Sequence, residues 1–366
     1  MMATKKILIL GKLPPPFMGP ALATKIILQS ELKLRYRLIH IDTKAYDSLS
    51  ELGKWSLKKV LRNYSIYFRM LKTCITRTPD LVLVPISQAT TGFIKDSIFI
   101  LIAWITGRKV IVQLRGSDFK SWLLNAKGWV RKYVAFVLHR TQGVIVLGQS
   151  LRHLFEDYFP AEKIYVVPNG ANYNLAYSSK HNQPLKVLYL ANLQASKGIE
   201  DLVDAVRILC SEGLRNFKVD VVGEWRKTET KIACETSVKE NNLPITFHPA
   251  NAGEGKMKFL SEADIFVFPP RAPEGHPWVI VEAMAAGLPV ISTDRGAIAE
   301  SVLDGQNGFI VPVQNPHALS SKLKMLIQDA FLRDRMGKES RRLYEENFTE
   351  EKMVERLSET FEKVMA

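Results

Sequence analysis

Short apolar runs alternate with longer segments of helical periodicity along most of the chain. The runs fall at residues 6–10, 38–41, 81–85, 110–114 and 143–147, and again at 186–191, 219–223, 245–249 and 264–269. Apolar runs of this length, separated by helical patterns, are typical of parallel strands joined by crossover helices. The pattern therefore predicts an α/β protein with parallel sheets. Its 366 residues exceed what one hydrophobic core usually holds, so two domains are expected.

The stretch EGHPWVIVEAMAAGLP, residues 274–289, predicts a buried helix that contains a carboxylate. Pro277 suits a first helical turn, and residues 278–286 are apolar on all sides except at Glu282. A buried carboxylate needs polar partners, and without a cation nearby on this helix Glu282 suits the two hydroxyls of a ribose. Glu274 precedes the helix, where free backbone N–H groups favour phosphate and sugar oxygens. The alternative is a Glu282 that is satisfied by the backbone of a neighbouring strand.

Two carboxylates eight positions apart, followed by AMAAGLPVI, resemble the donor-site motif of the retaining GT-B glycosyltransferases, glycosyltransferase family 4. The segment VVPNGAN (166–172) resembles the linker signature of that family, and the resemblance covers almost the whole chain. It implies two Rossmann-like domains whose parallel sheets face each other across a cleft. The domains implied are an acceptor-binding domain of residues 1–173 with a returning C-terminal helix at 349–366, and a nucleotide-sugar-binding domain of residues 174–348.

The resemblance also implies roles for individual residues. Catalysis would use Glu274, Lys197 and Arg115, with Lys197 facing the diphosphate that leaves. The residues implied in donor binding are Gly275, His276, Pro277, Trp278, Val279, Glu282, Asn192, Gly198, His248 and Pro249. A loop after the first strand, with Gly19 and Pro20, would face the acceptor and the donor phosphate. The alternative for that loop is a simple connection between a strand and a helix.

Three positions depart from the family pattern. The family usually has a second glycine where Pro20 stands, a histidine where Arg115 stands, and an arginine where Asn192 stands. Without that arginine, Lys197 would carry more of the diphosphate charge, together with Arg115 or Arg271.

The two candidate catalytic cations, Arg115 and Lys197, also have structural interpretations. Arg115 would pair with Asp118, and Lys197 would be an exposed lysine at the start of a helix. Because the helix dipole disfavours a cation at a helix N-terminus, the position of Lys197 favours an anionic ligand.

No Asp-x-Asp sequence occurs in the chain, so no metal that bridges a diphosphate is expected. Lys197 and the amides at helix starts would meet the charge of the departing diphosphate instead. No cofactor is expected, and the nucleotide-diphosphate sugar would be a co-substrate. The resemblance implies front-face attack with retention, since no second carboxylate is obviously placed on the far face of the sugar.

The positive charge is concentrated in the first half of the chain. Residues 1–175 hold 26 Lys and Arg against 10 Asp and Glu, whereas the whole chain holds 50 against 37. Residues 54–77 contain seven basic residues and no acidic one, and residues 120–140 interleave basic residues with Trp122 and Trp129. Two helices of this composition suit the surface of an anionic membrane. The alternative is that each helix has a solvated basic face and an apolar side in the core.

The start of the chain is expected to be a strand rather than a signal peptide, and residues 93–106 are too short an apolar stretch to span a bilayer. The cysteines have no metal or redox spacing, which suits a reducing compartment. We therefore expect a cytoplasmic protein bound peripherally to the inner face of the membrane.

The function expected is transfer of a sugar from a nucleotide-diphosphate sugar to a lipid-linked or glycan acceptor, in polysaccharide or glycolipid assembly. One alternative is a nucleotide-sugar 2-epimerase of similar fold, against which the two glutamates and Lys197-Gly198 speak. Another is a protein that binds nucleic acid through its basic half, but no motif for DNA or RNA is present, so no nucleic-acid partner is expected.

Overall fold

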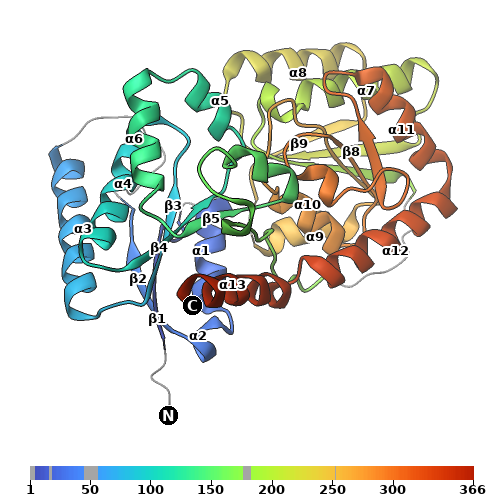
Figure 1. The fold of residues 1–366 in the computed structure, drawn as a ribbon. Helices are drawn as coiled ribbons and strands as arrows, with labels where there is room; N and C mark the ends of the chain where they lie inside the picture. Colours follow the sequence, from blue (N-terminus) through green and yellow to red (C-terminus); the bar gives the residue numbers. More distant parts are fainter. Residues whose placement is uncertain (1–4, 16–18, 45–56, 176–182, 252) are drawn as a thin grey trace. The chain divides into compact units, whose positions relative to one another are not determined.

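Two compact units make up the chain in the computed structural model. The structure describes residues 5–15, 19–44, 57–175, 183–251 and 253–366, with the side chains of all of these except 57–60. Unit 1 comprises residues 1–171 and 350–366, and unit 2 comprises residues 172–349. Each unit contains its own parallel sheet with helices packed on it (Figure 1).

Unit 1 is built on a sheet that has, among the described residues, six parallel strands in the order β2-β1-β3-β4-β5-β6. The strands are β1 (Lys6–Gly11), β2 (Arg37–Asp42), β3 (Leu81–Ile86), β4 (Lys109–Leu114), β5 (Gly143–Val146) and β6 (Ile164–Val166). The helices are α1 (Gly19–Gln29), α2 (Leu32–Arg35), α3 (Leu57–Thr76), α4 (Thr90–Ile105), α5 (Phe119–Leu124), α6 (Gly128–Leu138) and α13 (Glu350–Met365). β1 and β3 are buried along nearly their whole length, because helices cover both faces of a parallel sheet.

The last helix of the chain packs in the core of unit 1. α13 buries Leu357 and Phe361 in the same apolar cluster as Ile7 and Leu83 of the sheet. The Tyr36 hydroxyl also lies 3.1 Å from the Ser358 Oγ, and Figure 1 shows α13 beside α2. Residues more than three hundred positions apart therefore share one core.

Unit 2 has a second sheet of six parallel strands among its described residues, in the order β12-β11-β10-β7-β8-β9. The strands are β7 (Leu185–Leu190), β8 (Phe217–Val222), β9 (Ile245–His248), β10 (Ile265–Phe268), β11 (Val290–Thr293) and β12 (Gly308–Val311). The helices are α7 (Ile199–Ser211), α8 (Thr228–Glu240), α9 (Glu254–Glu262), α10 (Trp278–Ala285), α11 (Pro316–Gln328) and α12 (Ala330–Asn347).

Each sheet has a point at which the winding of the chain reverses. In unit 1 this point lies between β1 and β3, and in unit 2 between β7 and β10. Open parallel sheets bind ligands outside the carboxyl ends of their strands at such points. Pro20 follows β1, Lys197 follows β7 and Glu274 follows β10, so candidate residues of both units lie beyond the ends of these strands.

The α/β class and the parallel sheets are confirmed, and the predicted strands agree with the observed ones to within one or two residues. The single helix expected at 120–140 is wrong. Two helices, α5 and α6, replace it, and the break at 125–127 contains Asn125 and precedes Gly128, both poor helix formers. Most of the polar stretch at 176–183, expected to be a hinge, lies outside the described residues.

No helix in the described part of the chain is long and apolar enough to cross a membrane.

Candidate functional site

The centre of the unit 2 site is helix α10, which the sequence predicts almost to the residue. Pro277 caps its N-terminus with an extended backbone, and Gly287 ends it in the left-handed region at φ +66°. Its apolar side chains face the core on every side. Glu282 is therefore fully buried, with no exposed surface, as expected.

The Glu282 carboxylate has one paired and one unpaired oxygen. Lys256 of α9 forms an ion pair with Oε1, and the Tyr173 hydroxyl lies 3.5 Å from the same oxygen. Oε2 is buried and has no hydrogen-bond partner among the described residues. Burial raises the pKa of Glu282, and Lys256 opposes that rise. An unpaired buried acceptor is costly, so Oε2 is suited to a hydroxyl brought by a ligand.

Lys256 was not found by the sequence analysis. It lies on a short polar helix, Glu254–Glu262, that the hydrophobic pattern does not reveal. The expected alternative, a neighbouring strand that satisfies Glu282 through its backbone, is not what the structure shows for Oε1.

Lys197 and Glu274 meet at the carboxyl edge of the same sheet. Their side chains form an ion pair, and both are mostly buried. Lys197 ends a 3₁₀ turn after β7, and the Tyr189 hydroxyl donates to its backbone carbonyl at 2.9 Å. Gly198 follows in the left-handed region, and its lack of a side chain allows the turn to approach the Pro269 carbonyl. Lys197 is therefore a positioned side chain rather than a solvated lysine at a helix start.

The loop of Glu274 is fixed by Gly296. Gly296 adopts φ +68°, and a Cβ added there would overlap the Glu274 carbonyl oxygen. The Ala297 N–H also donates to the Gly275 carbonyl at 3.1 Å. The chain after β11 thus holds the loop that carries the catalytic candidate Glu274.

We expect Gly296→Ala to destabilise unit 2 and to weaken donor binding. Gly305 is a matched control, because it has a similar φ of +75° but open space around its Cβ. Gly305→Ala should lower the free energy of unfolding by about 1–2 kcal/mol, because alanine disfavours the left-handed backbone. Gly296→Ala should lower it by about 1–3 kcal/mol more because of the overlap with the Glu274 carbonyl. Urea unfolding of both variants measures the difference. Equal losses would show that the close approach has no energetic weight.

Asn192 stands where the resembling family usually has an arginine, and its side chain contacts the guanidinium of an arginine from another segment. The Arg226 Nη2 donates to Asn192 Oδ1 at 3.0 Å, while its Nη1 lies 3.4 Å from Glu224. Arg226 was not singled out in the sequence, because only the pairing of the loops after β7 and β8 brings it there.

Arg271, the other cation named beside Lys197, is paired with two carboxylates of α7. Its guanidinium donates to both oxygens of Asp201, at 2.9 and 2.8 Å, and to Glu200 at 2.7 Å. Bidentate pairing of this kind is among the strongest side-chain interactions. In this structure Arg271 is thus ion-paired, as Lys197 is, and its assistance to Lys197 stays a prediction.

The other predicted donor residues lie in varied settings. His248 at the end of β9 bonds Asp220 at 2.7 Å, and Pro249 after it is exposed. His276 is buried and lies 2.7 Å from the Ser301 hydroxyl, so it fixes the loop from inside. Trp278, at the start of α10, is half-buried. Gly275 is buried, and Val279 is half-buried.

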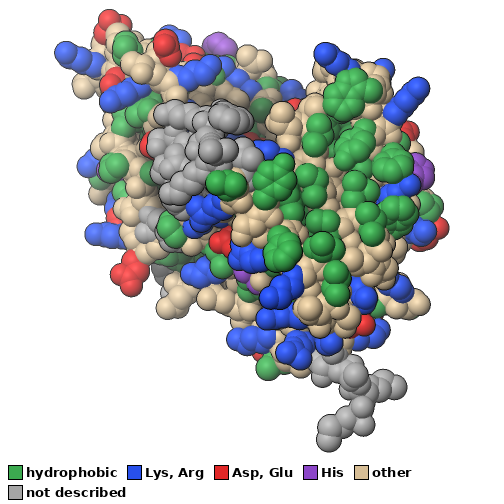
Figure 2. Space-filling model, turned by 90° about the vertical axis from the view of Figure 1, so that its left-hand side faces the viewer, with side chains coloured by type: hydrophobic (Ala, Val, Ile, Leu, Met, Phe, Trp, Pro, Cys, Tyr) green, Lys and Arg blue, Asp and Glu red, His purple; other side chains and the backbone are tan. Residues whose placement is uncertain are grey.

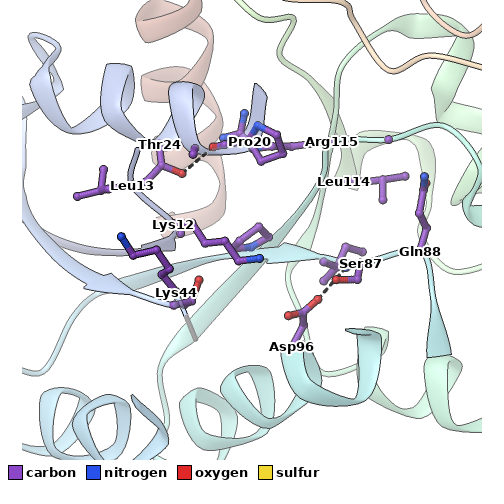
Figure 3. Close-up of a pocket in the computed structure, with 16 residues that line it drawn as sticks. Lys12, Leu13, Pro20, Thr24, Lys44, Ser87, Gln88, Asp96, Leu114 and Arg115 are labelled. Atoms are coloured by element: carbon purple, nitrogen blue, oxygen red, sulfur yellow. Dashed lines mark hydrogen bonds between the residues drawn. The ribbon is translucent and has the colours of Figure 1, made fainter. Parts of the chain in front are cut away.

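Arg115 lies in unit 1, where it shares a cavity of about 420 Å³ with Pro20 (Figure 3). Lys12, Lys44 and Asp96 also line this cavity. Gly19 begins α1 next to it in sequence. No ion pair joins Arg115 to Asp118, both of which the structure describes, so the structural alternative for Arg115 fails. Burial lowers the pKa of Arg115 to about 10.

Asp96 is the acidic group of this cavity. The Ser87 N–H donates to its Oδ2 at 2.8 Å. Burial nevertheless raises the pKa of Asp96 to about 6, because the hydrogen bond and the nearby lysines offset only part of the desolvation.

Residues 176–343 match the family model described as Glycosyl transferases group 1. The uncharacterized glycosyltransferase MJ1178 of Methanocaldococcus jannaschii is 27% identical over 256 residues, which cover 69% of this chain and 68% of that protein. CapM, a capsular polysaccharide biosynthesis glycosyltransferase of Staphylococcus aureus, is 25% identical over 71% of this chain and 72% of its own. The structure of Anabaena HepE in complex with UDP has a TM-score of 0.78 at 18% identity, over 98% of this chain and 100% of that one.

The two parallel-sheet units and this structural likeness define a GT-B fold. Within that fold, the family match to unit 2 supports a glycosyltransferase.

Proposed function

We propose that the protein is a retaining glycosyltransferase of family 4. Unit 2 would bind a nucleotide-diphosphate sugar, and unit 1 a hydroxyl-bearing acceptor that is lipid-linked or a growing glycan. The observation that carries the proposal is the buried, unpaired Oε2 of Glu282, on the helix that follows the Lys197–Glu274 pair. A carboxylate held in this way accepts hydrogen bonds from the vicinal hydroxyls of a ribose.

Lys197 would exchange partners when the donor binds. In the ligand-free chain its ammonium neutralises Glu274. A diphosphate would draw that ammonium to its own oxygens, which frees Glu274 to accept hydrogen bonds from the sugar hydroxyls. The bond from the anomeric carbon to the diphosphate oxygen then breaks, and a bond forms to the acceptor oxygen on the same face. The acceptor proton passes to the leaving diphosphate, and Lys197 stabilises the charge that develops there.

The proposed mechanism needs no metal, because protein cations carry the charge of the leaving group. We expect turnover to be the same in magnesium and in excess chelator.

Nucleotide binding tests the proposal independently of the acceptor. HepE is known as a complex with UDP, so uridine nucleotides head the panel. A cognate nucleotide at a hundred times its dissociation constant should stabilise the protein by about 2.7 kcal/mol, and a thermal-shift screen detects this. A protein that no nucleoside diphosphate stabilises would contradict the proposal.

A surface on α3 supports peripheral binding to a membrane in addition. One stripe of α3, with Ile66, Met70 and Cys74, is buried in unit 1. A second apolar stripe is exposed and consists of Leu61, Tyr64, Phe68, Leu71 and Ile75. We call this second stripe the outer face of α3. It continues the helical spacing of three and four residues, so it forms one line along the helix.

Basic side chains accompany the outer face. Arg69, Lys72 and Arg77 are exposed on or just after α3, which has no acidic residue in its described sequence Leu57–Thr76. Figure 2 shows hydrophobic side chains gathered on this side of the molecule next to Lys and Arg. An exposed apolar line beside positive charge matches an anionic bilayer, where the apolar side chains enter the headgroup region. Of the aromatic residues expected at the membrane, Trp129 is exposed, whereas Trp122 is half-buried and contacts the buried rings of Phe93 and Phe119.

Co-sedimentation with vesicles tests this surface. We expect binding to anionic vesicles and little to neutral ones. Phe68→Ser should reduce binding about tenfold through the lost burial, and Arg69→Gln with Lys72→Gln should reduce it by a similar factor at low salt. Phe331→Ser is the matched control, since Phe331 of α12 in unit 2 is equally exposed. Equal loss in the control, or equal binding to both kinds of vesicle, would rule out docking through α3. Concentration-dependent dimers that Phe68→Ser abolishes would assign the face to a second copy instead.

A further inference from the structure

The cavity of unit 1 is lined by several basic side chains. It lies at the carboxyl ends of four strands, with Lys12 after β1, Lys44 after β2 and Arg115 after β4. Figure 3 shows Arg115 extending towards Pro20, and Lys12 pointing towards Ser87 and Asp96. Three cations from the ends of three strands thus line one cavity.

Three cations stand against one carboxylate among the described residues that line this cavity. Asp96 is that carboxylate. The Lys44 Nζ donates only to the backbone carbonyl of Pro15, at 3.3 Å. Arg115 has no carboxylate partner in the described chain. A guanidinium withdrawn from water without a counter-charge is unfavourable, so the cavity is suited to an anion.

The net excess of two positive charges matches a phosphate ester or a diphosphate, which carry about two negative charges at neutral pH. Arginine presents a fork of N–H donors that fits two phosphate oxygens, and lysine adds a compact charge. None of the described lining residues is aromatic. A cavity of about 420 Å³ has the size of small-molecule sites in general.

Polar and apolar groups complete the lining. Thr24, Thr43 and Gln88 offer hydroxyl and amide groups, and Leu13 and Leu114 form apolar wall. A sugar attached to the phosphate would therefore find partners for its hydroxyls as well. Asp96 adds a carboxylate acceptor to these groups, and its Oδ2 accepts a hydrogen bond from the Ser87 N–H at 2.8 Å.

We infer that this cavity binds the phosphate-bearing end of the acceptor, with Lys12, Lys44 and Arg115 around the phosphate and Asp96 near the sugar hydroxyls. The inference rests on the proposed function, in which unit 1 binds the acceptor. The phosphate belongs either to a lipid-linked diphosphate or to a soluble sugar phosphate, and the chemistry that the cavity recognises is the same.

Binding of inorganic pyrophosphate tests the inference. All pyrophosphate measurements use the full chain with Lys197→Ala, so that the candidate diphosphate lysine of unit 2 does not contribute. Lys12→Gln and Lys44→Gln should each weaken binding about tenfold, as expected for the loss of one charged hydrogen bond. Asp96→Asn should tighten it, because a negative charge is removed while the acceptor for the Ser87 N–H is kept. Lys163→Gln, an exposed lysine outside the cavity, should change nothing.

Two results would contradict the inference or the function on which it rests. If Lys12→Gln, Lys44→Gln and Lys163→Gln bind pyrophosphate alike, the cavity is not the phosphate site. Thermal shift by UDP is recorded separately, on the same variants in a chain that retains Lys197. Retained UDP binding would then leave the proposed function standing, whereas its absence from every protein would contradict the function itself. Melting temperatures without ligand show whether a variant is merely unfolded.

Two competitors identify the source of the phosphate. Displacement of pyrophosphate by vesicles that contain a long-chain lipid diphosphate, but not by a soluble sugar phosphate, would assign the cavity to a lipid-linked acceptor. The reverse would assign it to a soluble one. Displacement by neither, at concentrations that exceed that of pyrophosphate many times, would overturn the inference.

Discussion

Replacing Lys197 with alanine is expected to lower turnover by about a hundredfold or more and to change KM much less. The side chain is mostly buried, ends a turn fixed by Gly198 and Tyr189, and lies against the carboxylate of Glu274. Negative charge on the diphosphate grows as the anomeric bond breaks, so a positioned ammonium stabilises the transition state more than the bound donor. Steady-state kinetics over a range of donor concentrations separates the two constants.

Lys186 is the matched control for this prediction. Its ammonium also forms an ion pair, with Glu262 at 2.8 Å, but at the beginning of β7 rather than beyond its end. Lys186→Ala should leave turnover within about twofold of the parent, because half-exposed ion pairs contribute about 1 kcal/mol or less. If both substitutions reduce turnover equally, Lys197 acts through the fold and not on the diphosphate.

The second large effect is expected for Glu282→Gln, which should weaken nucleotide binding about tenfold to a hundredfold without unfolding the protein. The substitution replaces an acceptor oxygen by a donor NH₂ group, so one of the ribose hydroxyls would lose its acceptor at a buried site. Isothermal calorimetry with the nucleotide found in the screen measures the change. An unaltered dissociation constant would falsify the ribose assignment.

A double variant separates this role from simple charge balance. Glu282→Gln alone leaves Lys256 without its partner, whereas Glu282→Gln with Lys256→Met removes the pair together. If Glu282 binds ribose, the double variant remains weak in nucleotide binding even where its stability matches that of the parent. Recovery of binding in the double variant would mean that the unpaired lysine, not the lost acceptor, caused the defect.

The ligand-free stability of Glu282→Gln should also depend on pH. Burial raises the folded-state pKa of Glu282, so the protonated carboxyl stabilises the fold below its unfolded pKa, and this contribution is lost as pH rises through the folded pKa. Glutamine resembles the protonated form at every pH. As pH rises through the folded-state pKa of Glu282, the variant should therefore become more stable relative to the parent. Below the unfolded-state pKa this difference in stability should disappear.

The burial of Glu282 follows from local sequence alone. The surrounding residues, 278–286, are apolar in every direction, so no rotation of the helix would expose this side chain. Strands such as β1 and β3 were found for the same reason, since each is a short apolar run that is buried along most of its length. Periodicity and end signals of this kind do not depend on the rest of the chain.

The partners of the site residues could not be found in this way. Lys256 reaches Glu282 from a polar helix that precedes it by 26 positions, and Arg226 reaches Asn192 through pairing of two loops. Lys12 and Lys44 share a cavity with Arg115 only because the strand order of unit 1 is β2-β1-β3-β4. Strand order depends on long-range packing, which no local pattern records.

Arg115 is a second case in which the neighbouring sequence does not reveal the contacts of a side chain. The sequence places it after the fourth strand, with Asp118, three residues away, as the natural local partner. The structure leaves that ion pair unmade and places the guanidinium in a cavity with two lysines. The surroundings of Arg115 were therefore indicated better by its location at the carboxyl end of β4 than by the nearest acidic residue in the sequence.

The central claim is transfer of a sugar with retention, and it is tested most directly by following both products of one reaction. The protein is incubated with nucleotide sugars and a membrane extract that supplies acceptors, in the presence of a chelator. Released nucleotide is measured by a phosphatase-coupled assay, and the anomeric configuration of the glycoside by NMR. We predict nucleotide release that requires the extract and a product with the anomeric configuration of the donor. An inverted product, or conversion of the donor to its 2-epimer without any acceptor, would contradict the account.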